Sequence, residues 1–234
     1  MNWQALRMPA RVREWWLAGA VAGVVYGALL VQVAMELPEG APLTGHIAMQ
    51  PLWKCAMVLL LARAAWFHRP VAERNWMVTA LVFSAQGDFL LAVPSLSVSF
   101  VGGLGAFLLA HLAYMCVLVP RAGDYRAHRL IACGAIMGVA GTMLGRFWPN
   151  LGVLMLPVVV YVIVLTAMVC SALVARLPTP LAALGALCFA ASDLMIGIAR
   201  FLLPFDNFHL SIWWTYAAAQ LLLVAGIVSG RAQA

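Results

Sequence analysis

Two aspartates lie inside otherwise apolar stretches of the chain. Asp88 stands in "LVFSAQGDFLLAV" (81–93), and Asp193 stands in "LCFAASDLMIGIA" (187–199). Two carboxyl groups that share a site of low dielectric cannot both ionise easily, so one can donate a proton while the other stays anionic. If the fold brings the two stretches together, the pair is suited to acid–base catalysis.

The elements that carry these acids must be membrane helices. Hydrophobic residues make up 65% of the 234 residues, charged residues only 9%, and the mean hydropathy is +0.97; soluble domains carry roughly 25% charged residues. A membrane-spanning helix needs about 20 apolar residues, and no alternating strands suggest a closed barrel. We predict one integral membrane domain over residues 1–234, an all-α bundle of eight transmembrane helices. The predicted helices are residues 15–34, 50–67, 75–92, 98–119, 128–146, 151–175, 181–200 and 210–229.

The arginines predict how the bundle is oriented. Most of them flank the predicted helices on one side: Arg7, Arg11, Arg13, Arg69, Arg74, Arg121, Arg126, Arg129, Arg176 and Arg231. Arg146 and Arg200 lie near the opposite side, together with Glu36, Glu39 and Asp206. The positive-inside rule therefore predicts that both termini are cytoplasmic, and the even number of helices agrees. The excess of arginine over lysine suggests a GC-rich bacterial genome, and hence the inner membrane.

The two acids belong to a larger similarity between the halves of the chain. His111 follows Asp88 by 23 residues, and Tyr216 follows Asp193 by the same number. At about 1.5 Å per residue, both acids lie at nearly the same depth, in the outer half of the membrane. We predict a parallel repeat of helices 1–4 and 5–8, with the two aspartates facing each other near its axis.

Other polar residues are placed to join the acids in one pocket. Lys54 lies early in the second helix, His111 and Tyr114 share a face of the fourth, and Tyr216 and Gln220 share a face of the eighth. Ionisable residues inside a membrane usually face the bundle interior and mark function. The alternative is that the acids and their partners only join helices, while Lys54 and Arg200 extend their charges to the interface.

Four segments resemble the motifs of the YhhN-like lysoplasmalogenase family, and they lie in the same order and at a similar spacing. They are "FSAQGDFLL", "GAFLLAHLAY", "FAASDLMIGIARF" and "TYAAAQLLL". The resemblance extends from Pro51 to Leu223, with "PLWK" (51–54) a looser match to a polar position early in helix 2. The family motif residues fall on Gly87, Asp88, His111, Tyr114, Ser192, Asp193, Tyr216, Ala219 and Gln220.

The resemblance implies an eight-span membrane hydrolase that cleaves the vinyl ether bond of lysoplasmalogens to a fatty aldehyde and a glycerophospholipid headgroup. Its partners would be the lysophospholipid substrate and the bilayer. We expect Asp88 and Asp193 to be catalytic. The expected substrate-binding or orienting residues are Lys54, His111, Tyr114, Ser192, Arg200, Tyr216 and Gln220. No metal or cofactor is expected, because the five histidines are scattered and only His111 is expected to be buried.

Two alternative functions use the same residues. A proton-coupled transporter would also need acids inside the membrane, but its helices are usually interrupted near the midplane. Pro157 in the sixth helix is the only clear interior proline here, which favours an enzyme. A hydrolase of another lysolipid is the second alternative, and the sequence leaves the headgroup preference and the oligomeric state open.

Overall fold

The fold of a computed structural model is described for residues 8–38, 41, 43–203 and 208–229. Within these residues all eight predicted apolar stretches are helices and no strand is present, which confirms the all-α prediction. The helices are α1 (Ala10–Glu36), α2 (Gln50–Trp66), α3 (Val71–Leu91), α4 (Ser99–Leu118), α5 (Ala127–Phe147), α6 (Met155–Val174), α7 (Leu181–Phe201) and α8 (Phe208–Val228).

Three helices begin four or five residues away from their predicted starts. The first helix begins at Ala10, five residues early, immediately after Pro9. The third begins at Val71, four residues early, immediately after Pro70. The sixth begins at Met155, because the residues before it form two short 3₁₀ turns, Trp148–Asn150 and Gly152–Leu154. Pro157 therefore lies in the first turn of α6, where a missing backbone N–H costs little. The prediction of an interior proline in this helix is wrong, so Pro157 does not interrupt it.

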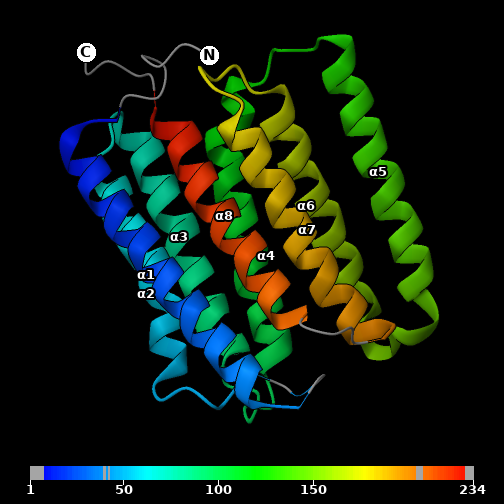
Figure 1. The fold of residues 1–234 in the computed structure, drawn as a ribbon. Helices are drawn as coiled ribbons and strands as arrows, with labels where there is room; N and C mark the ends of the chain where they lie inside the picture. The colour runs from blue at the N-terminus through cyan, green and yellow to red at the C-terminus, as the bar shows by residue number, and fades with distance from the viewer. Residues whose placement is uncertain (1–7, 39–40, 42, 204–207, 230–234) are drawn as a thin grey trace.

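Six of the helices, α1 and α4 to α8, have the length and hydropathy of a membrane span. The other two are α2, which has 17 residues, and α3, which carries Glu73, Arg74 and Asp88. In Figure 1 both run alongside the other helices of the bundle. Length therefore distinguishes α2, whereas charged residues lower the hydropathy of α3.

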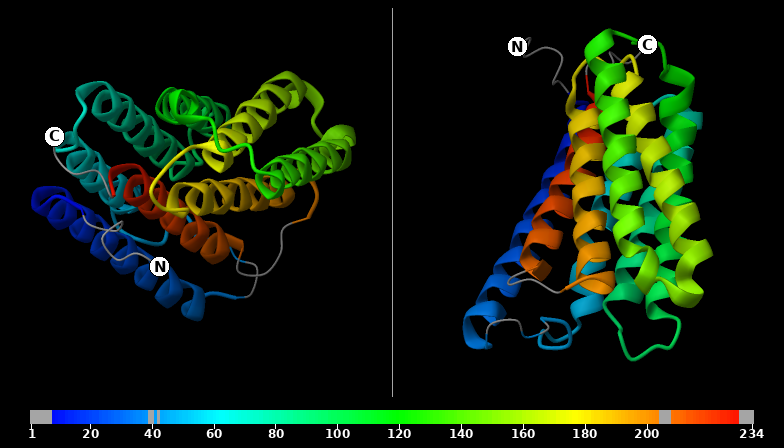
Figure 2. Two further views of the ribbon diagram at one scale, coloured as in Figure 1. Left: turned by 90° about the horizontal axis from the view of Figure 1, so that it is seen from above. Right: turned by 90° about the vertical axis from the view of Figure 1, so that its right-hand side faces the viewer.

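The packing of the helices surrounds a common interior. α1 packs against α2 and α8, and α3 lies between α2 and α4. α4 packs on α6, α6 on α7, and α7 on α8, while α2 also touches α8. α5 stands at the edge of the bundle, where it packs chiefly against α6 (Figures 1 and 2). Helices from both halves of the chain thus face the same interior.

The contact between α7 and α8 depends on glycine. A Cβ atom at Gly226 would overlap the backbone of Ala182, and one at Gly185 would lie 2.6 Å from the backbone nitrogen of Leu223. Small residues of this kind let membrane helices approach closely. The helix that carries Asp193 is therefore held directly against the helix that carries Tyr216.

One end of the bundle carries most of the described arginines. α1 begins and α8 ends at this end (Figure 1), which also holds Arg69, Arg74, Arg121, Arg126, Arg129 and Arg176. Arg7 and Arg231 lie outside the described residues, as do Glu39 and Asp206 of the opposite side. The described arginines are thus gathered on one side as the sequence predicts, although this distribution does not establish which side is cytoplasmic.

Ion pairs organise this arginine-rich end. Glu73 pairs with Arg121 and with His68, and both Glu73 and His68 are buried. The expectation that His111 alone among the histidines is buried is therefore wrong, because the carboxylate of Glu73 supplies a polar partner for His68. On the neighbouring loop, hydrogen bonds from Arg126 lower the pKa of Asp124 to about 2, so Asp124 stays ionised at neutral pH.

Candidate active site

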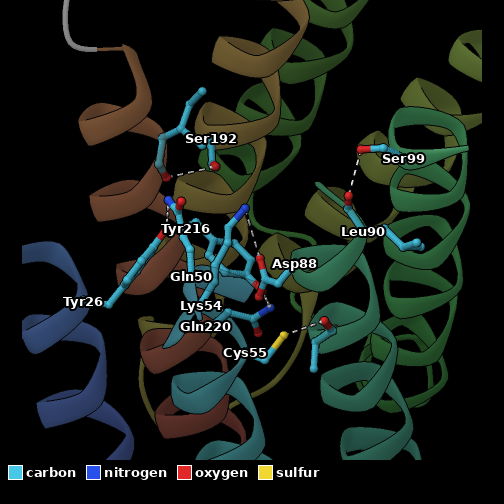
Figure 3. Close-up of polar contacts among 12 residues, drawn as sticks. Tyr26, Gln50, Lys54, Cys55, Asp88, Leu90, Ser99, Ser192, Tyr216 and Gln220 are labelled. Carbon is cyan, nitrogen blue, oxygen red and sulfur yellow. Dashed lines mark hydrogen bonds and ion pairs between the residues drawn. The ribbon is translucent and has the colours of Figure 1, made fainter. Parts of the chain in front are cut away.

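The first carboxylate is bound from two neighbouring helices. Asp88 lies in the last turn of α3 and is 1% exposed. The Tyr216 hydroxyl of α8 donates a hydrogen bond of 2.6 Å to Oδ2 of Asp88, and Lys54 Nζ of α2 lies 3.7 Å from Oδ1 (Figure 3). A buried carboxylate needs partners of this kind, because desolvation would otherwise make its charge costly.

A chain of hydrogen bonds continues from Tyr216 into the protein. Nε2 of Gln220 donates to the Tyr216 hydroxyl oxygen at 3.2 Å, and the Tyr114 hydroxyl of α4 donates to Oε1 of Gln220 at 2.6 Å. All three side chains are buried. Because Gln220 supplies the hydrogen bond that Tyr216 accepts, the hydroxyl hydrogen of Tyr216 is left to point at Asp88.

The second carboxylate has a corresponding set of partners. The Tyr161 hydroxyl of α6 donates to Oδ2 of Asp193 at 2.6 Å. Nε2 of His111 lies 3.1 Å from the Tyr161 hydroxyl and 3.4 Å from Asp193 Oδ2. Since the hydroxyl hydrogen of Tyr161 is directed to Asp193, its oxygen can accept a hydrogen bond from His111. Nδ1 of the buried His111 has no hydrogen-bond partner among the described residues.

The two sets of partners correspond to each other in the way that the predicted repeat implies. The first acid is held by residues of α2 and α8, and the second by residues of α6 and α4. Asp88 and Asp193 are 105 residues apart, and so are His111 and Tyr216. Each acid therefore has one partner from its own half of the chain and one from the other half, as a two-fold relation requires. The helix contacts follow this pattern in part. α4 packs on α6 as α8 packs on α2, but α1 packs on α8 while α5 makes no comparable contact with α4.

Both acids line one small polar cavity of about 70 Å³. Lys54, Tyr216 and Ser192 line it as well, and so do Leu43 and Thr44. Those last two residues precede α2, at the end of the bundle opposite the arginine-rich end. The cavity therefore lies toward the side that the sequence predicts to be the outer one.

A second, apolar cavity of about 280 Å³ lies between α4, α5, α6 and α7. Its walls are mostly aliphatic and aromatic, with Tyr161, Thr166 and Asp193 as the polar exceptions. Asp193 lines both cavities, and its side chain is 8% exposed. The second carboxylate thus stands where a polar and an apolar space meet.

The predicted site residues do not all lie in this network. Lys54, His111, Tyr114, Tyr216 and Gln220 are joined to one acid or the other by the contacts above. Ser192 lines the polar cavity, but its hydroxyl donates to the backbone oxygen of Ile212 in α8 at 3.2 Å.

Four predicted residues line neither cavity: His111, Tyr114, Gln220 and Arg200. Of these four, only Arg200 is not joined to an acid by the contacts above. Its guanidinium packs over the ring of Phe100, 5.0 Å from the centroid.

The sequence analysis missed several polar residues of the site. Tyr161 is the most important of them, and it lies 107 residues after Lys54, close to the 105-residue offset of the repeat. Extending the repeat to the second helix would have found it. Tyr26, Gln50 and His209 also line the polar cavity, and Gln50 donates to the Tyr26 hydroxyl at 3.0 Å. No motif marked these three.

In the described part of the chain, no three side chains of His, Cys, Asp or Glu gather as they would around a metal ion. The absence of a cofactor remains a prediction.

Comparison of the sequence with known proteins identifies the family of the chain. The sequence model of the YhhN family matches residues 49–227. The chain is 50% identical over 220 residues to the lysoplasmalogenase of Mycobacterium tuberculosis (strain CDC 1551 / Oshkosh), which covers 92% of this chain and 84% of that protein. It is 34% identical over 175 residues to lysoplasmalogenase TMEM86B of Homo sapiens, which covers 74% of this chain and 72% of that protein. No solved structure matches the chain.

Proposed function

The chain belongs to the YhhN family, and we propose that it is a lysoplasmalogenase. It would hydrolyse the vinyl ether bond of a lysoplasmalogen in the membrane, releasing a fatty aldehyde and glycerophosphocholine or glycerophosphoethanolamine. One observation carries this proposal beyond the resemblance: two carboxylates line the same cavity, and each accepts a hydrogen bond from a tyrosine hydroxyl.

The reaction begins with transfer of a proton to carbon. One carboxyl group, in its acid form, protonates the alkene carbon farther from the ether oxygen, and the alkene electron pair forms the new C–H bond. The product is an oxocarbenium ion, which the other carboxylate stabilises by its negative charge. Glycosidases divide the work between two carboxyl groups for a similar transition state.

Water completes the cleavage. Its oxygen attacks the oxocarbenium carbon, and its proton passes to the carboxylate that donated one, so the acid is regenerated and a hemiacetal forms. Collapse of the hemiacetal breaks the bond to the glycerol oxygen, which takes up the hydroxyl proton of the hemiacetal. The hydroxyls of Tyr161 and Tyr216 hold the two carboxylates in place for these steps.

A substitution of each acid tests this mechanism. Asp88→Asn and Asp193→Asn should each lower aldehyde release from a purified lysoplasmalogen by at least about 10³-fold, since each removes a proton-transfer or charge-stabilising group. The matched control is Asp124→Asn, the same change in an ion pair on the loop before α5, which should retain activity.

Size-exclusion profiles and melting temperatures in detergent would show that the variants fold. Activity close to wild type in either aspartate variant would exclude the paired-acid mechanism. If the folded wild-type protein releases no aldehyde from choline or ethanolamine substrates, proton uptake into proteoliposomes would test the transporter.

Lys54 is the cation that we assign to the phosphate of the headgroup. It lines the polar cavity with a side chain that is 20% exposed, whereas Arg200 lies outside both cavities. Lys54→Gln should raise KM, and Arg200→Gln should leave it unchanged. A KM that is unaffected by Lys54→Gln would remove the headgroup role, and an increase in Arg200→Gln would transfer it.

We place the enzyme in a bacterial inner membrane with both termini in the cytoplasm. The arginine-rich end of the bundle then faces the cytoplasm. The polar cavity lies toward the opposite face, so the substrate headgroup would reach it from the outer leaflet.

A further inference from the structure

We infer that the apolar cavity between α4, α5, α6 and α7 binds the hydrocarbon chain of the lysolipid, which directs the vinyl ether bond to the two carboxylates. The inference rests on the proposed function and deepens it, because it assigns a chain-binding site to a cavity whose lining, apart from Tyr161 and Asp193, lies outside the catalytic network.

The cavity has the size and character of a hydrocarbon site. Its volume of about 280 Å³ is close to the lower limit of typical ligand pockets, roughly 300–1,000 Å³. Its walls include Leu104, Ile136, Val162 and Leu165. A chain enclosed by such side chains gains free energy in proportion to the area that it buries.

The apolar cavity shares part of its lining with the polar cavity. Four residues line both spaces: Leu91, Phe107, Asp193 and Ile196. Phe107 also contacts the Tyr216 ring edge-on, with the ring centroids 5.8 Å apart. The two cavities therefore share Asp193, and Phe107 links their common wall to the partner of Asp88.

The substrate, like the site, has a polar part and an apolar part. In a lysoplasmalogen the vinyl ether joins a charged glycerophospho-headgroup to a long apolar chain. With the headgroup near Lys54 in the polar cavity and the chain in the apolar cavity, the bond between them lies at Asp193. No other arrangement within these two cavities places both parts of the molecule in a matching environment.

The chain site predicts how activity depends on chain length. Each methylene that enters the cavity adds binding, so kcat/KM of the wild-type protein should rise with the length of the alkenyl chain until the cavity is filled. A bulky residue in the cavity should remove this dependence for long chains, while a short-chain substrate is still cleaved.

Two neighbouring residues of α6 provide a matched test. Val162 lines the cavity, whereas Ile163 is 60% exposed on the outer surface of the helix. Val162→Trp should lower kcat/KM for a sixteen-carbon alkenyl substrate by about tenfold or more, the loss expected if roughly two methylenes are no longer buried. An eight-carbon substrate should be much less affected. Ile163→Trp should behave as wild type with both.

A second pair of variants, on α5, keeps the test valid if Val162→Trp does not fold. Ala140→Phe fills the same cavity from another wall, and Met137→Phe, at a position that is 56% exposed, is its control. Binding of a radiolabelled 1-O-hexadecyl ether lysolipid, which cannot be cleaved, would be measured on the same preparations.

The outcomes separate the chain site from the catalytic proposal. Weaker binding and a selective loss of long-chain activity in both cavity variants would support the chain site. An active wild-type protein whose chain-length dependence survives both cavity variants would overturn it and would indicate that a structural bilayer lipid fills the space. An inactive wild-type protein would instead contradict the proposed function, and the binding measurement alone would then decide whether the cavity takes the chain.

Discussion

At the scale of single residues, the structure gives each carboxylate a different set of partners. Asp88 is held by a tyrosine hydroxyl and a lysine, whereas Asp193 is held by a tyrosine hydroxyl that a histidine contacts in turn. Because both acids accept a hydrogen bond from a tyrosine hydroxyl, the difference lies in Lys54 beside Asp88 and His111 beside Asp193. Such inequality is what separates the roles of two carboxyl groups in one site.

The tyrosine hydroxyls should contribute to turnover according to their distance from the acids. Tyr161→Phe and Tyr216→Phe each remove a hydrogen bond to a carboxylate, and we expect kcat to fall about 10- to 100-fold, the effect of a charge-assisted bond. KM should change little, because neither change alters the size of the cavities. Tyr114→Phe, which is two hydrogen bonds from Asp88, should reduce kcat less.

Steady-state kinetics of these three variants would check this order. Tyr125→Phe serves as the control, because Tyr125 is 60% exposed on the loop before α5. A larger loss in Tyr114→Phe than in Tyr216→Phe would contradict the hydrogen-bond chain as the way in which Tyr216 is oriented.

At the scale of elements, the site depends on helices that are distant in the sequence. α3 and α8 meet through Asp88 and Tyr216, which are 128 residues apart. Gly185 and Gly226 allow α7 and α8 to touch, and the contact sets the position of one acid relative to the partner of the other. The glycines of α5 differ, because nothing lies within 4 Å of a Cβ placed on Gly134, Gly138, Gly141 or Gly145.

Substitution by alanine should therefore affect stability differently at the two kinds of glycine. Gly226→Ala should destabilise the folded protein by roughly 1–3 kcal/mol, because its Cβ would overlap the backbone of Ala182 and the helices would have to move apart. Gly138→Ala should leave stability nearly unchanged. Melting temperatures in the same detergent would check both, and equal values for the two variants would contradict the close packing of α7 on α8.

At the scale of the whole molecule, polar groups are divided between an interior network and one charged end. The arginine-rich end is held together by ion pairs from Glu73 to Arg121 and from Asp124 to Arg126 and Arg129. The polar cavity lies toward the other end. This division predicts both the orientation in the membrane and the leaflet that supplies the substrate.

Cysteine labelling would test the orientation. In a background in which the five native cysteines are replaced, Ser95→Cys on the loop after α3 should react with a membrane-impermeant maleimide in intact cells. Tyr125→Cys, on the loop before α5, should react only after permeabilisation. The reverse pattern would place the arginine-rich end outside and move the substrate to the inner leaflet.

The sequence alone determined the elements and the chemistry that they carry. Eight apolar stretches predicted the eight helices, because length and hydropathy are local properties that a membrane helix must satisfy. Asp88 and Asp193 stood out for the same local reason, since a carboxylate inside an apolar helix is costly without a purpose. Only helix starts that depend on prolines and 3₁₀ turns, such as that of α6, were displaced.

Only the tertiary structure decided which residues meet. It pairs Asp88 with a residue of α8 and Asp193 with residues of α4 and α6, adds Tyr161, and leaves Arg200 outside. It also buries His68 beside Glu73 and places Asp193 at the boundary of a polar and an apolar cavity. The physical reason is that these contacts depend on which helices pack together, and local composition and periodicity do not specify the neighbours of a helix.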